Sequence, residues 1–179
     1  QRITLDDSLV QLFGEFNHYH KQIHVVTHYN HPREITAESQ QAISLLQKER
    51  ILIHNQTVFL RGVNDKPHVL ANLMNQLTGI GVIPYYVFQC RPVKHVKAGF
   101  QIPLYEGYQI IEKAKKQLNG ISKRFRFVMS HQTGKIEIIG ISGNEIFFKY
   151  HQARNPANLG HLFRRRLNRT GAWLDDFEA

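Results

Sequence analysis

The stretch "IHNQTVFLRGVND", residues 53–65, decides the fold. Its first half is an apolar, strand-like run that Asn55 and Gln56 interrupt, and an Arg-Gly turn follows it. Asp65 and Pro67 then open a helix, because proline is favoured in the first helical turn. The stretch therefore predicts a strand, a tight turn and a helix, and it leaves the two amides in the strand to be explained.

The same strand and helix unit recurs along the chain, about 30 residues apart. We expect strands at 23–28, 51–56, 82–90 and 124–130, and helices that begin at Thr4, Thr36 and Asp65 and span 104–118. Strands that alternate with helices form right-handed βαβ units, and hence a parallel sheet or barrel. Two alternating segments around Ser142-Gly143-Asn144 then predict a β-hairpin. The fold class is therefore α/β, with a parallel part and an appended hairpin.

Three regions follow from this pattern. Residues 1–130 would hold the parallel strands and helices, 131–150 a loop and the hairpin, and 151–179 a basic C-terminal tail. The tail ends in an apolar cluster of Trp173, Leu174 and Phe177, so we expect it to pack on its parent or on a partner.

Composition excludes several classes of protein. The chain has 179 residues, of which 42% are hydrophobic, enough for a real core. It has no apolar run of the roughly 20 residues that span a bilayer, so a cytoplasmic protein without membrane contact is expected. Cys90 is its one cysteine, which rules out an internal disulfide, a Cys-rich zinc site and an iron-sulfur cluster held by this chain alone. We expect no metal site.

The net charge of +9 points to anionic partners. Basic residues are dense only at 113–116, 123–126 and 164–169. The common nucleic-acid motifs are missing from the sequence, and a solvated basic face explains such runs. Nucleic acid is therefore not an expected partner.

Polar residues gather at the ends of three predicted strands. These are Thr27, His28, Asn30 and His31 on the first, Asn55 and Gln56 on the second, and Gln89, Cys90 and Arg91 on the third. The carboxyl ends of parallel strands form the ligand site in α/β folds. The amides are thus predicted to line a pocket mouth, although each could instead bond a neighbouring loop, since a buried amide needs a partner.

Four motifs, "QRIT" (1–4), "THYNHPREIT" (27–36), "NQTVFLRGVND" (55–65) and "PYYVFQC" (84–90), carry a family resemblance. In order and spacing, residues 1 to about 135 resemble the second half of the lysine 2,3-aminomutase family of radical S-adenosylmethionine (SAM) proteins. The residues beyond the hairpin match that family poorly. The resemblance implies a partial (β/α) barrel of radical SAM type, of which this chain holds the later strands.

The resemblance also implies cofactors and site residues. Family members cleave SAM with a [4Fe-4S] cluster and move an amino group between adjacent carbons of an amino acid held on pyridoxal phosphate (PLP). His28 and Gln56 match positions near the adenosyl group. The residues Tyr85, Tyr86 and Phe88 match the strand beside the PLP. Lys135 falls where the family's PLP lysine lies, and such a lysine must lose its proton to attack an aldehyde.

Departures from the family pattern limit what this chain can do alone. The family's CxxxCxxC motif lies upstream of anything in this sequence, and Cys90 cannot replace three thiolates. The cluster half is therefore missing, lost or supplied by another polypeptide. The loop before Lys135 is also reduced to Thr133-Gly134.

Substrate choice depends on two positions. Lysine-specific members place carboxylates where this chain has Arg91 and Ser130. A cation that faces a cation is repelled, whereas arginine grips a carboxylate with two hydrogen bonds. We therefore expect an acidic or otherwise non-lysine amino acid as substrate. The alternatives are that Arg91 points to solvent or binds the PLP phosphate.

Two further expectations concern partners. Half a barrel leaves an open strand edge, so the chain should pair with the missing N-terminal half or with a second copy in a homo-oligomer. The alternative function is a catalytically inactive binding module that contacts an anionic partner through Arg164, Arg165, Arg166 and Arg169.

Overall fold

A computed structural model describes residues 3, 6–17 and 21–178 of the chain. Its elements in chain order are α2 (Asp7–Asn17), β1 (His24–Thr27), η1 (Pro32–Glu34), α3 (Ala37–Lys48), β2 (Leu52–Phe59), α4 (Pro67–Gly79), β3 (Ile83–Gln89), α5 (Lys97–Phe100), α6 (Leu104–Lys115), β4 (Arg126–His131), β5 (Gly134–Ser142), β6 (Glu145–Ala153), η2 (Pro156–Asn158), β7 (Leu162–Arg166) and η3 (Leu174–Asp176). The predicted helix start at Thr4 lies outside the described residues. Within the described ranges, no helix is long and apolar enough to cross a membrane.

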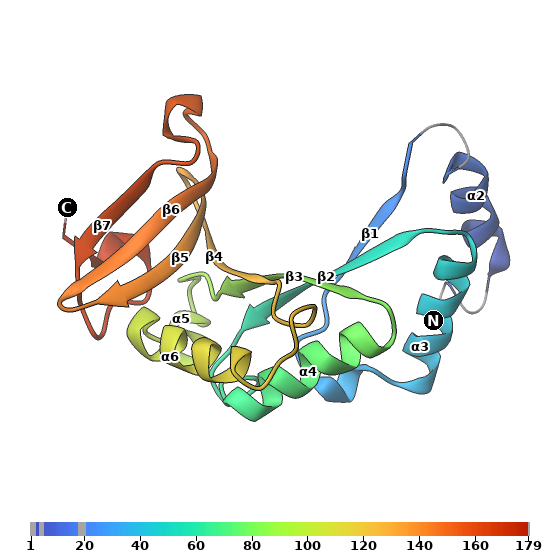
Figure 1. Cartoon of the computed structure of the whole chain (residues 1–179), viewed down its shortest axis with the longest axis horizontal. Coiled ribbons are helices and arrows are strands. Elements are labelled where there is room, and N and C mark those ends of the chain that lie inside the picture. The colour runs from blue at the N-terminus through green and yellow to red at the C-terminus, as the bar shows by residue number, and fades with distance from the viewer. Residues whose placement is uncertain (1–2, 4–5, 18–20, 179) are drawn as a thin grey trace.

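One seven-stranded sheet runs through the molecule in the order β1-β2-β3-β4-β5-β6-β7 (Figure 1). The pairs β1–β2, β2–β3 and β3–β4 are parallel, and the pairs from β4 to β7 are antiparallel. The hairpin predicted around residue 143 is confirmed, with Ser142 opposite Glu145 and Gly143 in the left-handed region at φ 56°. The parallel part is an open sheet in the described chain, so closure into a barrel stays a prediction.

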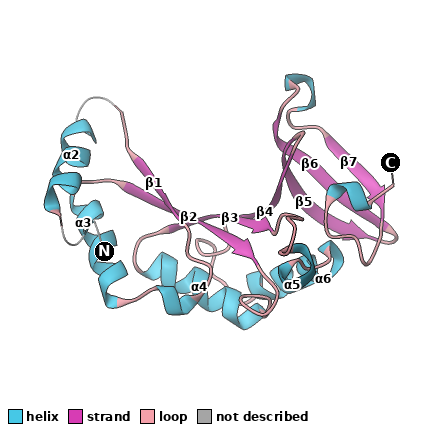
Figure 2. Ribbon diagram, turned by 180° about the vertical axis from the view of Figure 1, so that it is seen from behind, coloured by secondary structure: helices cyan, strands magenta, loops and turns pink. Residues whose placement is uncertain are grey.

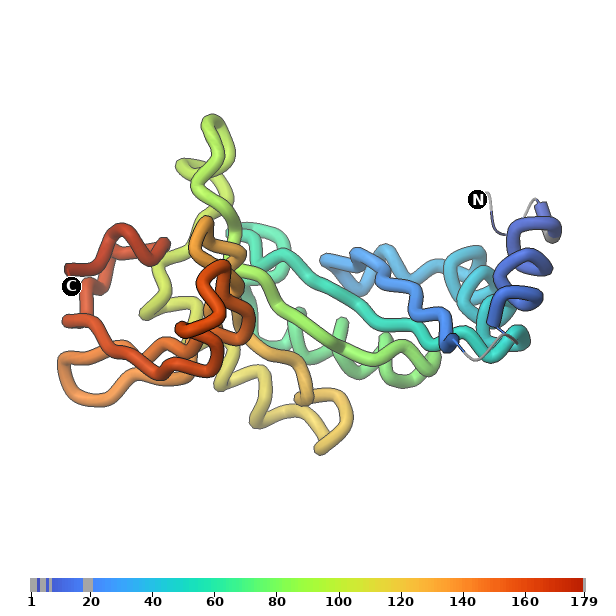
Figure 3. Tube along the Cα trace, turned by 90° about the horizontal axis from the view of Figure 1, so that it is seen from above, coloured from blue at the N-terminus to red at the C-terminus, as the bar shows by residue number. Residues whose placement is uncertain are grey.

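Helices cover one face of the parallel part and leave the other face open. Figure 2 shows α4, α5 and α6 together on one side of the strands, and Figure 3 places α2 (blue) and β7 (red) at opposite ends of an elongated body. The alternation of β2 explains this layering, because Ile53 and Phe59 are buried in the core while His54 and Gln56 point the other way. The open face is therefore free to carry a site.

Helix starts were predicted with mixed success. Thr36 caps α3 as expected, since its side chain accepts a hydrogen bond from the Ser39 amide. Pro67 opens α4, but the cap position is Lys66, without a side-chain bond. Asp65 instead accepts a hydrogen bond from the Gly62 amide at 2.8 Å and closes the turn before the helix. The helix therefore begins at Pro67 and not at Asp65, whose carboxylate binds the backbone amide three residues earlier.

The segment from residue 151, expected to pack on its parent or on a partner, continues the sheet and contacts the core of its own chain. Strand β6 runs from Glu145 to Ala153, so the chain does not divide at residue 150. Strand β7 adds the last member of the sheet, with Phe148 opposite Phe163. Trp173 and Phe177 are each only 7% exposed and join the main core. The late apolar cluster thus packs on its own chain.

Candidate active site on the open face of the sheet

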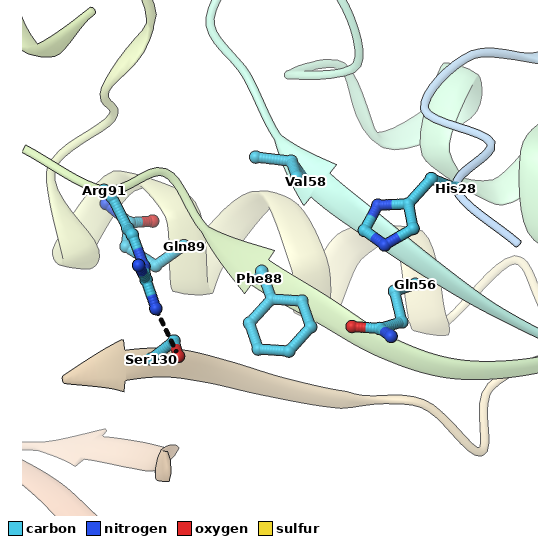
Figure 4. A pocket seen from close by; sticks show the side chains of 7 residues that line it. All are labelled: His28, Gln56, Val58, Phe88, Gln89, Arg91 and Ser130. Carbon is cyan, nitrogen blue, oxygen red and sulfur yellow. Dashed lines mark hydrogen bonds between the residues drawn. The ribbon is translucent and has the colours of Figure 1, made fainter. Parts of the chain in front are cut away.

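A cavity of about 360 Å³ opens on the face that the helices leave bare. It is lined by His28, Gln56, Val58, Phe88, Gln89, Arg91 and Ser130 (Figure 4). Five of the eight predicted site residues are among them: His28, Gln56, Phe88, Arg91 and Ser130. Residues far apart in the sequence are therefore brought to one cavity, at the carboxyl ends of the parallel strands.

The strand geometry sets which side chains reach this cavity. Gln56 and Val58 are alternate residues of β2 and so share a face, and the register places Phe88 of β3 beside Val58. His28 follows the last residue of β1, and Arg91 lies two residues beyond β3. The parallel register thus gathers side chains from successive strands into one wall.

Arg91 and Ser130 are joined directly. The Arg91 guanidinium donates a hydrogen bond to Ser130 Oγ at 2.8 Å, drawn as a dashed line in Figure 4. Among the described residues, no carboxylate lies within 4.0 Å of the Arg91 guanidinium. Its remaining N–H donors are therefore available to an anionic group that enters the cavity.

Lys135 adjoins the same cavity. It pairs with Ser130 across the antiparallel β4–β5 ladder, which places both side chains on the open face. Its ammonium lies 5.4 Å from the centroid of the Phe88 ring, which lines the cavity, and 4.4 Å from that of Tyr86. Aromatic faces at these distances attract a cation, and they replace part of its water. The half-buried lysine thus lies next to the cavity, beside Phe88, without being one of the residues that line it.

Tyr85 and Tyr86 lie farther along the open face and do not line the cavity. A register shift between Asn55 and Gln56 leaves Tyr85 unpaired beside Tyr86, and their ring centroids are 3.8 Å apart. The Tyr86 hydroxyl donates to that of Tyr85 at 2.9 Å. Burial first, and then this bond, raise the pKa of Tyr86 well above its usual range, so Tyr86 stays a neutral phenol.

The prediction for the two amides was half right. Gln56 lines the cavity, but Asn55 is only 1% exposed and faces the other side. Asn55 Oδ1 accepts from the Tyr29 amide at 2.7 Å, and its Nδ2 donates to the Tyr29 carbonyl at 3.1 Å. Asn55 therefore ties the end of β1 to β2, the loop-bonding role that was the alternative. The period of two along the strand separates the amides, because neighbouring residues face opposite sides.

Asn30 and Asn64 also brace the strand ends. Asn30 Oδ1 accepts from the Val58 amide at 2.7 Å, and Asn64 Nδ2 donates to the carbonyls of Asn30 and Val58, both at 2.8 Å. These bonds hold the loop after β1 against β2. The sequence pattern grouped Asn30 with the pocket residues, but its side chain positions the backbone.

Val58 is a cavity residue that the sequence reasoning missed, although its spacing of two from Gln56 places it on the same face. Gln89, expected at the strand end, lines the cavity and is 2% exposed. Its Nε2 donates to the carbonyls of Ile102 and Ala172 at 2.7 and 2.9 Å, which ties β3 to the C-terminal segment. No spacing signal links Gln89 to a residue 83 positions away.

The described part of the chain holds no group of three or more His, Cys, Asp or Glu side chains placed to bind a metal ion. Cys90 is buried, and that burial raises the pKa of its thiol. A single buried thiol does not provide the several thiolates that a [4Fe-4S] cluster needs. The residues present do not fit the cluster.

Comparison with known proteins gives consistent relatives. No family model matches the chain. The protein named "Putative L-lysine 2,3-aminomutase" from Aquifex aeolicus (strain VF5) is 42% identical over 98% of this chain and 47% of its own length. The L-lysine 2,3-aminomutase of Methanococcus maripaludis is 44% identical over 63% of this chain and 24% of its own length. The glutamate 2,3-aminomutase of Clostridioides difficile is 32% identical over 67% of this chain and 28% of its own length.

The Aquifex match covers 177 residues and so takes in the C-terminal segment, which corrects the expectation that the segment matches the family poorly. A solved radical SAM methyltransferase from Sphaerobacter thermophilus is a distant structural neighbour, with a TM-score of 0.45 and 14% identity over 67% of this chain and 38% of its own. The chain spans about half or less of the length of these relatives. This chain is therefore related to the lysine 2,3-aminomutase family, as its motifs led us to expect.

Proposed function

We propose that this chain is part of a radical SAM, PLP-dependent aminomutase that moves an amino group between adjacent carbons of a non-lysine amino acid. The observation that carries the proposal is the cavity that joins His28, Gln56, Phe88, Arg91 and Ser130, with Lys135 next to it beside Phe88. In such an enzyme the cluster and SAM supply a hydrogen-abstracting radical, and PLP carries the amino group while it moves. The cluster ligands would have to come from outside this chain, because its single cysteine is buried.

The aromatic residues around the Lys135 amine suit a bound PLP ring. The amine lies within 4.4 Å of the Tyr86 ring centroid and 5.4 Å of that of Phe88, so a flat pyridine ring would meet aromatic walls there. A lysine attacks an aldehyde through its deprotonated amine, and the Lys135 amine lies beside the rings that would flank the cofactor. Lys135 would bind the cofactor, and Tyr86 and Phe88 would position it.

Arg91 supports an acidic substrate. Its guanidinium keeps free donors after bonding Ser130, and the planar fork matches a carboxylate. The ammonium of a lysine substrate would instead face a like charge in a partly enclosed cavity, which disfavours it. The glutamate 2,3-aminomutase among the relatives fits this choice of substrate class. The substrate would enter with its side-chain carboxylate toward Arg91.

The open edge of β1 supports a further part of the proposal. In the described chain β1 pairs on one side only, with β2. Val26 and Leu52 are 42% and 43% exposed on these two strands. We infer that this edge is covered by the other barrel half or by a second copy of the chain. A compact, well-behaved monomer of this chain in size-exclusion chromatography would count against the inference.

The alternative, a basic binding module, has weaker support. Arg164 pairs with Glu145 at 3.1 Å, Arg165 lies over the Phe163 ring, and Arg169 lies over the Tyr105 ring. These contacts use the arginines within the chain. An anion-binding surface built from them would lose affinity steeply as salt rises, which a binding titration at two ionic strengths would detect.

The experiment that tests the main proposal uses the natural full-length protein, purified without oxygen and with PLP present. We expect cluster absorbance, a mass well above that of this chain, and a borohydride-reducible PLP adduct that peptide mapping assigns to Lys135. Lys135→Ala should lose the adduct, whereas Lys113→Ala, on the exposed side of α6, should keep it. A colourless protein that forms no adduct would refute the proposal and leave the family relation as ancestry.

A further inference from the structure

A second hollow lies beside Tyr86, whose ring packs against the hollow residue His151. Its volume is about 280 Å³, and its lining residues are Arg126, Glu137, Lys149, Tyr150, His151, Leu159 and Gly160. They come from β4, β5, β6 and the turn that leads to β7. Sequence reasoning singled out none of these residues as a binding site.

Arg126 is held in place without being neutralised. Its Nη1 lies 2.6 Å from His151 Nδ1, and because a guanidinium only donates, the imidazole nitrogen accepts. Among the described residues, no carboxylate lies within 4.0 Å of Arg126 or Lys149. The Arg126 guanidinium is therefore held by a neutral imidazole, and its other N–H groups can donate hydrogen bonds to an anion.

The hollow carries an excess of positive charge. Arg126, Lys149 and the nearby Lys135 are cations, and among the described residues the carboxylate that acts on His151 with them is Glu137. Burial first, and then Arg126, lower the pKa of His151, which keeps the imidazole neutral near pH 7. A doubly negative group would be attracted by this arrangement, with Glu137 offsetting only part of the attraction.

Lys135 connects the hollow with the cavity. Its ammonium lies 4.4 Å from the Tyr86 ring centroid, and the Tyr86 ring packs against His151 with centroids 5.7 Å apart. The same ammonium lies 5.4 Å from the centroid of Phe88, a cavity residue. One ligand attached at Lys135 could therefore place an anionic end in the hollow and its reactive end in the cavity.

We propose that Arg126, Lys149 and His151 form a phosphate-binding site beside Lys135. The ligand class is a phosphate monoester or inorganic phosphate, held by charge-assisted hydrogen bonds from the guanidinium and the ammonium. If the phosphate is that of PLP bound at Lys135, this site anchors the cofactor, and that reading rests on the proposed function. If it is a free phosphate, the site stands without that function.

The test compares Arg126→Gln with Arg164→Gln, which removes the same charge from β7 outside the hollow. Inorganic phosphate is titrated into the full chain while the imidazole signals of His151 are followed by NMR. Wild type and Arg164→Gln should show a saturable shift of His151, and Arg126→Gln should bind about tenfold more weakly or worse, as expected for a lost charge-assisted bond. Both variants should stay folded, because each change is at an exposed side chain. Thermal unfolding of both variants checks this.

A second arm distinguishes the sources. Equal concentrations of PLP and of pyridoxal, which lacks the phosphate, compete for Lys135, and borohydride reduction with peptide mapping counts the adducts. A wild-type preference for PLP that falls about tenfold in Arg126→Gln supports the cofactor as source. A saturable phosphate shift without any Lys135 adduct supports a free phosphate and counts against the proposed function alone. A His151 signal that ignores phosphate, or an Arg126→Gln variant that matches Arg164→Gln in both arms, overturns the site.

Discussion

Replacement of Asn55 tests whether the buried amide holds the open sheet together. Asn55→Ala removes the bonds from Oδ1 to the Tyr29 amide and to Thr27 Oγ1, and those from Nδ2 to the Tyr29 carbonyl and to Thr57 Oγ1. The two threonine hydroxyls keep other partners, the carbonyls of His54 and Tyr29. The main loss is therefore the pair of bonds to the Tyr29 backbone.

The magnitude follows from these contacts. A hydrogen bond contributes about 1 kcal/mol net to stability, and an N–H left unpaired away from water costs about 1–3 kcal/mol more. Two lost bonds to Tyr29 and one unpaired amide give a decrease of about 3–5 kcal/mol in the free energy of unfolding. The loss should appear in urea unfolding as a lower midpoint with an unchanged slope.

The control is the neighbouring residue. Gln56→Ala removes an amide that faces the cavity, and its side chain makes no hydrogen bond within the described part of the chain. Its free energy of unfolding should change by no more than about 0.5 kcal/mol. A loss below about 1 kcal/mol for Asn55→Ala would refute the bracing role. An equal loss for Gln56→Ala would refute the assignment of the two amides to opposite faces.

Three other predictions concern the turn before Lys135, the pH dependence of stability and the choice of substrate. Gly134→Ala should lower the free energy of unfolding by several kcal/mol, because φ is 149° at this residue and a Cβ would collide with a carbonyl oxygen of β6. Gly120 has open space around it, so Gly120→Ala should match wild type in thermal unfolding. Burial, and then a neighbouring histidine, lower the pKa of His54 below 6.5, so unfolding takes up a proton below that pH. The free energy of unfolding should therefore fall as the pH drops through about 6.5. His54→Gln should reduce this pH dependence in urea titrations at pH 5–8. In the full-length protein, the double change Arg91→Asp and Ser130→Asp should shift preference from glutamate to lysine in a competition assay; an unchanged preference would show that neither side chain meets the substrate.

Periodicity was enough to predict a parallel part of the sheet and where the hairpin turns. The repeat of strand and helix every 30 residues or so indicated βαβ units, and it left an open sheet and a barrel as alternatives. Periodicity could not predict the register shift between Asn55 and Gln56. The two amides already interrupt the alternation of apolar and polar residues in this strand, so a bulge there gives no separate sequence signal. The paired rings of Tyr85 and Tyr86 follow from that bulge, so their arrangement could be seen only in three dimensions.

The site was predictable where it depends on strand ends and unpredictable where it depends on contacts across long separations. His28, Gln56 and Arg91 follow from the rule that parallel strands present their carboxyl ends together. The hollow at Arg126 and His151 depends on an antiparallel extension whose register shifts at Lys135, and nothing in the spacing of 25 residues between them signals it. Family resemblance did not help there either.

The Asn55-Gln56 pair shows how one strand serves both fold and chemistry. A strand between a helical layer and an open face must satisfy two environments at consecutive positions. On the covered side a polar residue survives only when its groups are bonded, as those of Asn55 are. On the open side an amide can keep its donors and acceptor for a ligand, as Gln56 does at the cavity wall. Exchanging the two residues should therefore cost stability through position 55 before it alters any chemistry at position 56, although both positions would still carry an amide.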